Sequence, residues 1–144
     1  MSAADDIYDA AIKDLAARAR NMGRIEDADC SHDADNFLCG DRVTVEVALN
    51  GDAIENIGGK VRGCMLVQAA AAVIHGAAPG KDRAVLTDGI AQARALLSDG
   101  TPATGDWEGL NAFTPVQGHK HRHDCVLLPF EAVEACLADT DGTD

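Results

Sequence analysis

Aromatic residues are scarce in this chain of 144 residues, which is only 3% aromatic. Hydrophobic residues nevertheless make up 47% of it, so the core has to be built mainly from Ala, Val, Ile and Leu. A chain of this length and apolar content is expected to fold as a single globular domain over residues 1–144. We expect its ordered core to run from about residue 5 to about residue 138.

Positively charged residues are also scarce. The chain has 12 Lys and Arg against 24 Asp and Glu, a formal net charge of −12, and no basic run. An acidic excess of this size disfavours DNA, RNA and anionic membranes, because phosphate binding needs Lys and Arg. The expected partners are therefore proteins or cations, with no nucleic acid and no membrane.

Long apolar runs are missing as well. No stretch approaches the roughly 20 apolar residues of a membrane span. The first residues, MSAADDIYDAAIKDLAARAR, begin with acidic side chains and have helical periodicity, which is unlike a signal peptide. A cytoplasmic location is the resulting expectation.

The chain has five cysteines, and an odd number in a cytoplasmic protein argues against a disulfide framework. Cys30 stands in a polar segment and is expected to be an exposed bystander. Cys136 falls on the apolar face of a predicted helix and is expected to pack in the core. Neither is assigned to metal or sulfur chemistry.

The spacing of apolar residues predicts an N-terminal helix, a β-hairpin and three further helices. The first helix runs from Ile7 to Met22, with Ser2 or Asp5 as its N-cap. The segment 24–40 is polar and aperiodic and is expected to be a loop with a short edge strand near Ile25. A strand over 43–49, an NGD turn and a weaker strand over about 53–62 follow, with a bulge expected at Gly58 and Gly59. Two helices are then expected, over about 64–78 and 82–98. A long loop over 99–120 holds Trp107, Leu110 and Phe113, and the last helix begins near Cys125. This order predicts an α+β domain, with a small antiparallel sheet and helices packed on one side of it.

Three cysteines lie at boundaries of these elements. Cys39 precedes the first clear strand, while Cys64 and Cys125 stand at predicted helix N-termini, where free N–H groups and the helix dipole stabilise a thiolate. With Asp41 they make a four-ligand set that Zn²⁺ accepts tetrahedrally, and iron–sulfur clusters are also held by thiolates. On the residues alone, three structural thiols and an Asp in a turn remain the alternative.

The motifs around these residues resemble the NifU-like family of iron–sulfur scaffold proteins. The family pattern N-P-x-C-G-D corresponds here to residues 36–41, NFLCGD, and its G-C before a helix corresponds to Gly63 and Cys64. The third cysteine is Cys125 within RHDCVLLPF, which is similar to the SufU branch, whereas the Leu-Pro-Pro-Val-Lys segment of the IscU branch is absent. Phe37 replaces the usual Pro, Val61 stands where Gly is common, and the family serines after the second Cys are alanines within 69–72.

The resemblance implies a SufE/NifU-like fold and a metal site made by Cys39, Asp41, Cys64 and Cys125. Gly40 would let the side chains on either side of it converge on one ion. The implied cofactor is zinc or an iron–sulfur cluster, of the 2Fe–2S type if it is a cluster. The implied role is a carrier rather than an enzyme, with sulfur transfer through Cys39.

Three functions follow from this resemblance. The first is a scaffold that accepts sulfur from a cysteine desulfurase, binds iron or a nascent cluster and passes it to apo iron–sulfur proteins. The second is a zinc-bound sulfurtransferase that accepts persulfide sulfur from the desulfurase. The third is a zinc-stabilised interaction module without sulfur chemistry.

Other titratable residues near these positions have more than one interpretation. His119, His121 and His123 alternate in a loop, where they either supply an auxiliary ligand beside Cys125 or form a solvated polar segment. We favour the solvated segment. Lys60, Arg62 and Arg122, all near the expected ligands in sequence, either tune the thiolates, meet a partner's charge, or are ordinary surface residues.

Overall fold

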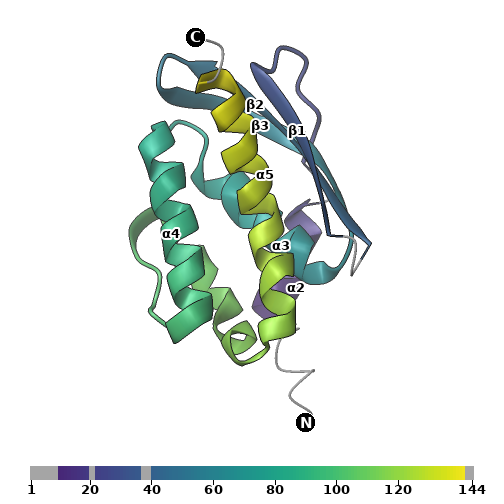
Figure 1. Ribbon diagram of the computed structural model, residues 1–144, viewed down its shortest axis with the longest axis vertical. Coiled ribbons are helices and arrows are strands. Elements are labelled where there is room, and N and C mark those ends of the chain that lie inside the picture. Colours follow the sequence, from purple (N-terminus) through teal and green to yellow (C-terminus); the bar gives the residue numbers. More distant parts are fainter. Residues whose placement is uncertain (1–9, 20–21, 37–39, 142–144) are drawn as a thin grey trace.

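The structure is a computed structural model that describes residues 10–19, 22–36 and 40–141 (Figure 1). The expected N-cap residues and Ile7 lie outside this part of the chain. Within it, no helix is both long enough and apolar enough to cross a membrane. The elements, in chain order, are α2 (Ala10–Ala19), β1 (Cys30–Asn36), β2 (Asp41–Asn50), β3 (Ala53–Arg62), α3 (Met65–Ala77), α4 (Arg83–Asp99), the 3₁₀ segments η1 (Gly105–Gly118) and η2 (Lys120–Arg122), and α5 (His123–Asp141).

The sheet has three antiparallel strands in the order β1-β2-β3, and the helices lie on one side of it (Figure 1). Val43, Val45 and Val47 of β2 are buried and face the helices, as their alternation predicts. The predicted fold class is therefore confirmed. The opposite face of the sheet carries Arg42, Thr44 and Glu46 of β2.

The loop predicted over 24–40 is wrong for residues 30–36, which form strand β1, and the edge strand expected near Ile25 is not formed there. This strand pairs with β2 from Cys30 opposite Val47 to Asn36 opposite Asp41. Burial alternates along β1 with a period of two, but the inward positions hold Cys, His, Ala and Asn rather than large apolar residues. Because the inward positions lack large apolar residues as well, the strand has no hydrophobic alternation to detect.

The predicted bulge at Gly58 and Gly59 is also misplaced. Both glycines pair regularly with β2, and the irregularity lies instead at Ala48 and Leu49, near the hairpin turn. A Cβ at Gly58 would overlap the Gly23 carbonyl, and one at Gly59 would overlap the Thr44 carbonyl. These glycines allow close backbone approach rather than an extra residue.

The region 99–120 is not the open loop that its Gly and Pro content predicts. Most of it forms η1, and Trp107, Leu110, Phe113 and Val116 of this segment are buried. Their spacing is three residues, which is the repeat of a 3₁₀ helix and places all four on one side. Trp107 packs against Phe130 of α5, with ring centroids 5.8 Å apart.

Helices α3 and α4 lie close to the predicted bounds, whereas α5 begins two residues before Cys125 and continues to Asp141. Pro129 is therefore inside α5 rather than in its first turn. The helix also extends three residues past the expected end of the ordered core.

The expected roles of Cys30 and Cys136 need correction. Cys30 is buried, not exposed, and forms a disulfide with Cys136, with the two Cα atoms 5.5 Å apart. Cys136 is fully buried, as expected, but it is bonded rather than free. The bond joins the first residue of β1 to α5. The odd number of cysteines did not exclude a disulfide, because one pair can form while the other thiols remain available for a metal site.

Candidate metal centre

Asp41 lies at the first position of β2, immediately after the connection from β1. Gly40 precedes it with a φ of 71°, in the left-handed region that favours glycine, and its N–H donates to the Asn36 carbonyl. The Asp41 side chain has the same strand parity as Val43, so it is on the helix side of the sheet. It is only 2% exposed, which is unusual for a carboxylate.

The Asp41 carboxylate is fixed against the residue that begins α3. Its Oδ1 accepts a hydrogen bond of 2.9 Å from the Cys64 backbone N–H, and its Oδ2 lies 3.7 Å from the Cys64 Sγ. Gly63 makes this approach possible, because a Cβ at that position would overlap the carboxylate. The Gly-Cys pair thus serves the site through its backbone as well as its thiol.

Cys64 is the N-cap residue of α3, with extended backbone angles and a half-buried side chain. A hydrogen bond from Cys125 lowers the pKa of its thiol from 9.0 to about 7, against the opposing effect of burial. The backbone N–H groups of Val67 and Leu66 also lower this pKa, while the Asp41 charge raises it. About half of the Cys64 thiol is therefore ionised at neutral pH, which suits a metal ligand or nucleophile.

Cys125 lies in the first turn of α5 and is fully buried. It comes from the opposite end of the sequence from Asp41, yet it meets Cys64 because the N-terminal ends of α3 and α5 converge at the same end of the sheet. Both helix dipoles place their positive ends there, which favours anionic sulfur.

The candidate ligand atoms of Asp41, Cys64 and Cys125 all lie within 4.8 Å of one another. Ligands about 2.3 Å from a tetrahedral zinc are separated by roughly 3.8 Å, so these residues suit such an ion with small adjustments. Two soft thiolates and one carboxylate are donors that zinc and iron accept. In the described part of the chain, no other cluster of His, Cys, Asp or Glu has comparable ligand spacing.

Cys39, the remaining predicted ligand, lies outside the described residues. It stands two positions before Asp41 in the sequence, so the chain connects it directly to the site. Its role as a ligand and sulfur acceptor stays a prediction.

The histidines do not form a second metal site among the described residues. The Nε2 of His123 lies 3.1 Å from the Val116 carbonyl oxygen and 3.0 Å from the Gln117 carbonyl oxygen, so this nitrogen carries a proton and donates. His119 and His121 stack edge to face with centroids 6.1 Å apart. The contacts of His123 join η1 to the start of α5 and leave Nε2 unsuitable as a ligand atom.

Comparison with known proteins identifies the family of this chain. A family model described as the NifU-like N terminal domain matches residues 7–97, more than half of the chain. The chain belongs to the NifU-like N-terminal domain family. This confirms the predicted resemblance.

Relatives of this NifU-like chain cover almost its whole length. The zinc-dependent sulfurtransferase SufU of Bacillus subtilis (strain 168) is 28% identical over 145 residues, covering 96% of this chain and 94% of that protein. A nitrogen-fixing NifU-like protein (N-terminal) from Brucella abortus has a crystal structure that matches with a TM-score of 0.92 and 27% identity, over 99% of this chain and 100% of that one. A putative iron–sulfur cluster assembly scaffold protein for the SUF system from Fervidobacterium islandicum AW-1 matches with a TM-score of 0.84 and 26% identity, over 91% and 96%.

Proposed function

We propose that this protein is an iron–sulfur cluster assembly scaffold that accepts sulfur from a cysteine desulfurase and holds iron or a nascent cluster for transfer to apo-proteins. The observation that carries the proposal is the convergence of Asp41, Cys64 and Cys125 at one end of the sheet. Family membership and the resemblance to a scaffold protein of the SUF system support it. In this role the cluster is cargo, held by thiolates that two helix N-termini stabilise.

Sulfur transfer would take place at Cys39. Its thiolate attacks the terminal sulfur of a persulfide on the desulfurase, forming a new S–S bond on Cys39. The S–S bond of the donor breaks, and the donor cysteine leaves as a thiolate, so no external oxidant or reductant is needed. Cys64 and Cys125 would anchor the metal, and Asp41 would be the fourth ligand, which is the weakest match to a soft site.

A zinc-bound sulfurtransferase is the second candidate, favoured by the name of the Bacillus subtilis relative. Cys39, Asp41, Cys64 and Cys125 would then hold the ion. Zinc would keep the thiols deprotonated and ordered. The buried carboxylate and the lowered pKa of Cys64 suit this role equally, because both favour anionic ligands before the metal arrives.

Anaerobic purification, followed by metal and sulfide analysis and a visible spectrum, separates the two functions. Brown protein containing iron and sulfide is expected of the scaffold, and colourless protein with one zinc is expected of the sulfurtransferase. Transfer of ³⁵S from desulfurase-bound persulfide then tests the chemistry. A zinc protein that accepts no sulfur would contradict both candidates and leave an interaction module. Cys64→Ala should lose the metal in either case.

A further inference from the structure

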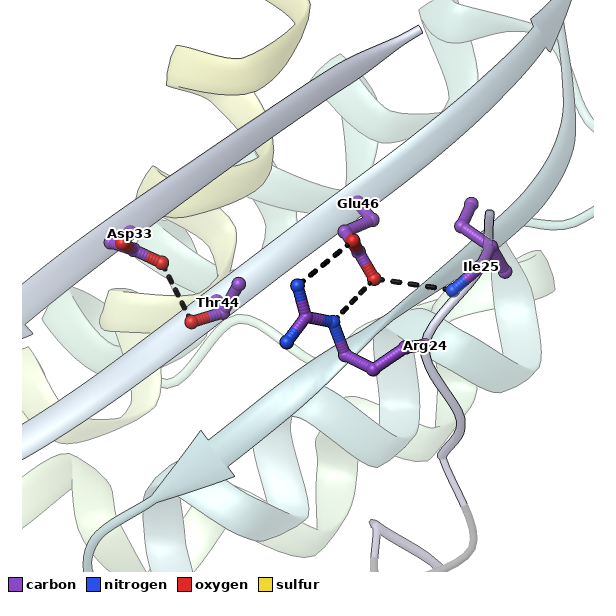
Figure 2. A network of polar contacts seen from close by, with 5 residues as sticks. All are labelled: Arg24, Ile25, Asp33, Thr44 and Glu46. Atoms are coloured by element: carbon purple, nitrogen blue, oxygen red, sulfur yellow. Dashed lines mark hydrogen bonds and ion pairs between the residues drawn. The ribbon is translucent and has the colours of Figure 1, made fainter. Parts of the chain in front are cut away.

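The face of the sheet that the helices leave open contains a hollow of about 360 Å³. Residues of strands β1, β2 and β3 line it, together with Arg24 from the segment that leads into β1. Figure 1 shows these strands, and Figure 2 shows Arg24, Asp33 and Thr44 from this lining. We call it the basic hollow, and its lining residues are Arg24, Ser31, Asp33, Arg42, Thr44, Lys60 and Arg62.

The charge of the basic hollow is opposite to that of the whole chain. Four of the 12 Lys and Arg line it, together with a single lining carboxylate, in a chain whose net charge is −12. Two further carboxylates, those of Asp35 and Glu46, pair with its arginines, and the balance is still positive. Such a local excess attracts anions although the protein as a whole repels them.

Two of the four cations are held in place by ion pairs. The Arg24 guanidinium donates to both carboxylate oxygens of Glu46, at 2.8 and 3.1 Å, and the Ile25 N–H donates to the same carboxylate (Figure 2). Arg42 lies 3.3 Å from an Asp33 oxygen, and the other Asp33 oxygen accepts from the Thr44 hydroxyl. These contacts hold Arg24, Arg42 and Asp33 in place, and the net charge of the hollow remains positive.

The other two cations, Lys60 and Arg62, are exposed, and within the described part of the chain no ion pair is found for either. Arg62 lies directly opposite Arg42 in the β2–β3 register. Like charges in directly opposed positions destabilise a sheet. A charge arrangement that costs stability and is left open to solvent is typical of a surface that meets an anionic partner.

The basic hollow ends at the rim of the candidate metal centre. Arg42 follows Asp41 directly, and Arg62 is separated from Cys64 only by Gly63. The two arginines therefore occupy the outer face of the sheet at the end where the thiols and the carboxylate meet on the inner face. A protein bound in the hollow would therefore lie next to the end of the sheet that carries the metal centre.

We propose that the basic hollow docks an acidic surface of the sulfur-donating enzyme and so directs that enzyme to the thiol site. This inference rests on the proposed function, because it states where the sulfur-donating enzyme would bind. An acidic protein surface fits better than a nucleic acid, since the chain's overall charge of −12 repels a long polyphosphate. Complementary charge of this kind mainly accelerates association.

The test compares Lys60→Glu/Arg62→Glu with a control of equal charge change, Arg18→Glu/Arg94→Glu, on α2 and α4. The second-order rate of ³⁵S transfer from a cysteine desulfurase is measured at about 20 mM and 500 mM salt, together with metal content. We expect the hollow variant to lose about tenfold in rate at low salt, with normal metal content and an unchanged rate at saturating donor. The control should stay within about twofold of wild type, and high salt should remove the difference.

Equal rates for the hollow variant and the control would overturn the inference while leaving the proposed function intact. If wild-type protein accepts no sulfur, the proposed function fails instead. In that case, binding of a fluorescent octaglutamate peptide, read by anisotropy, still tests the surface. Salt-sensitive binding that Lys60→Glu/Arg62→Glu abolishes supports the acidic partner. No binding, or tighter binding of a 20-nucleotide single-stranded DNA, contradicts it.

Discussion

The Asp41 carboxylate accepts the backbone N–H of Cys64 at 2.9 Å, although the two residues are 23 positions apart. One side chain thereby joins the start of β2 to the N-cap of α3. The same carboxylate offers its other oxygen next to the Cys64 sulfur. Asp41 thus has two separable roles: it positions Cys64, and it provides an anionic oxygen at the candidate metal centre.

Two substitutions at Asp41 separate these roles. Asp41→Asn keeps an oxygen that accepts the Cys64 N–H but removes the charge, whereas Asp41→Ala removes both. We expect Asp41→Ala to lower the free energy of unfolding of the metal-free protein by about 1–3 kcal/mol, because a buried N–H loses its acceptor. Asp41→Asn should lose less than half of that. Urea unfolding of the metal-free proteins measures the difference.

Metal binding should respond differently from stability. Both Asp41→Asn and Asp41→Ala should weaken zinc binding in competition with a chelator, since a closed tetrahedral site loses its anionic oxygen. If the protein carries a cluster, Asp41→Ala should still acquire it but pass it more slowly to an apo-ferredoxin, followed by circular dichroism. Unchanged zinc affinity together with unchanged transfer would mean that Asp41 only positions Cys64.

Gly63 is predicted to be essential for the same contact. Gly63→Ala puts a Cβ where the Asp41 carboxylate now lies, so we expect a loss of about 1–3 kcal/mol in unfolding free energy together with weaker zinc binding. Gly76→Ala is the matched control, because Gly76 lies in α3 and a Cβ added there would have open space around it. The control should be neutral or stabilising by up to about 1 kcal/mol. Equal behaviour of the two variants would argue against the close packing at Gly63.

The pKa of Cys64 predicts its reactivity in the metal-free protein. With a pKa of about 7, roughly half of the thiol is ionised at neutral pH, compared with a few per cent for an ordinary cysteine. Alkylation by iodoacetamide, resolved to the Cys64 peptide by mass spectrometry, should therefore have its midpoint near pH 7. Cys125→Ala should raise the midpoint, because it removes the hydrogen bond that lowers the pKa most. Asp41→Asn should lower it, because the Asp41 charge raises the pKa. A midpoint near pH 9 in all three proteins would refute this view of the site.

Much of this site could be predicted from local sequence patterns. The alternation in β2 and the Ala-rich face of α3 are periodic within one element, so they place Asp41 at a strand start and Cys64 at a helix start. The pairing of Arg42 with Arg62 could not be predicted in this way. Counting from the turn, where Asn50 pairs with Ala53, would place Arg42 opposite Val61, and the irregularity at Ala48 and Leu49 shifts the register to Arg62. The contact between Asp41 and the Cys64 N–H lies beyond that shift, so the hairpin signal alone did not predict it.

Other features depend on contacts between distant segments. Strand β1 is polar on its outer face because Asp33 and Asp35 meet Arg42 there, and this arrangement exists only once β2 is in place. The packing of η1 does have a local signal, the spacing of three from Trp107 to Val116, but Gly and Pro in the same region obscured it. The disulfide joins residues 106 positions apart, a distance over which no short pattern operates.

That disulfide gives the last prediction. Closing so long a loop restricts the unfolded chain, and in the chain-entropy model this stabilises the fold by about 2–5 kcal/mol. Of the five cysteines, two are then bonded, so thiol titration of the denatured, unreduced protein should find three. Reduction should lower the urea midpoint of wild type, while Cys30→Ala/Cys136→Ala should already have a low midpoint that does not respond to reductant. Zinc or iron content should be the same in both proteins, since neither Cys30 nor Cys136 belongs to the cluster of candidate metal ligands. Five titratable thiols in protein prepared without reductant would contradict the bond, and metal loss from a folded double variant would show that one of these sulfurs belongs to the site after all.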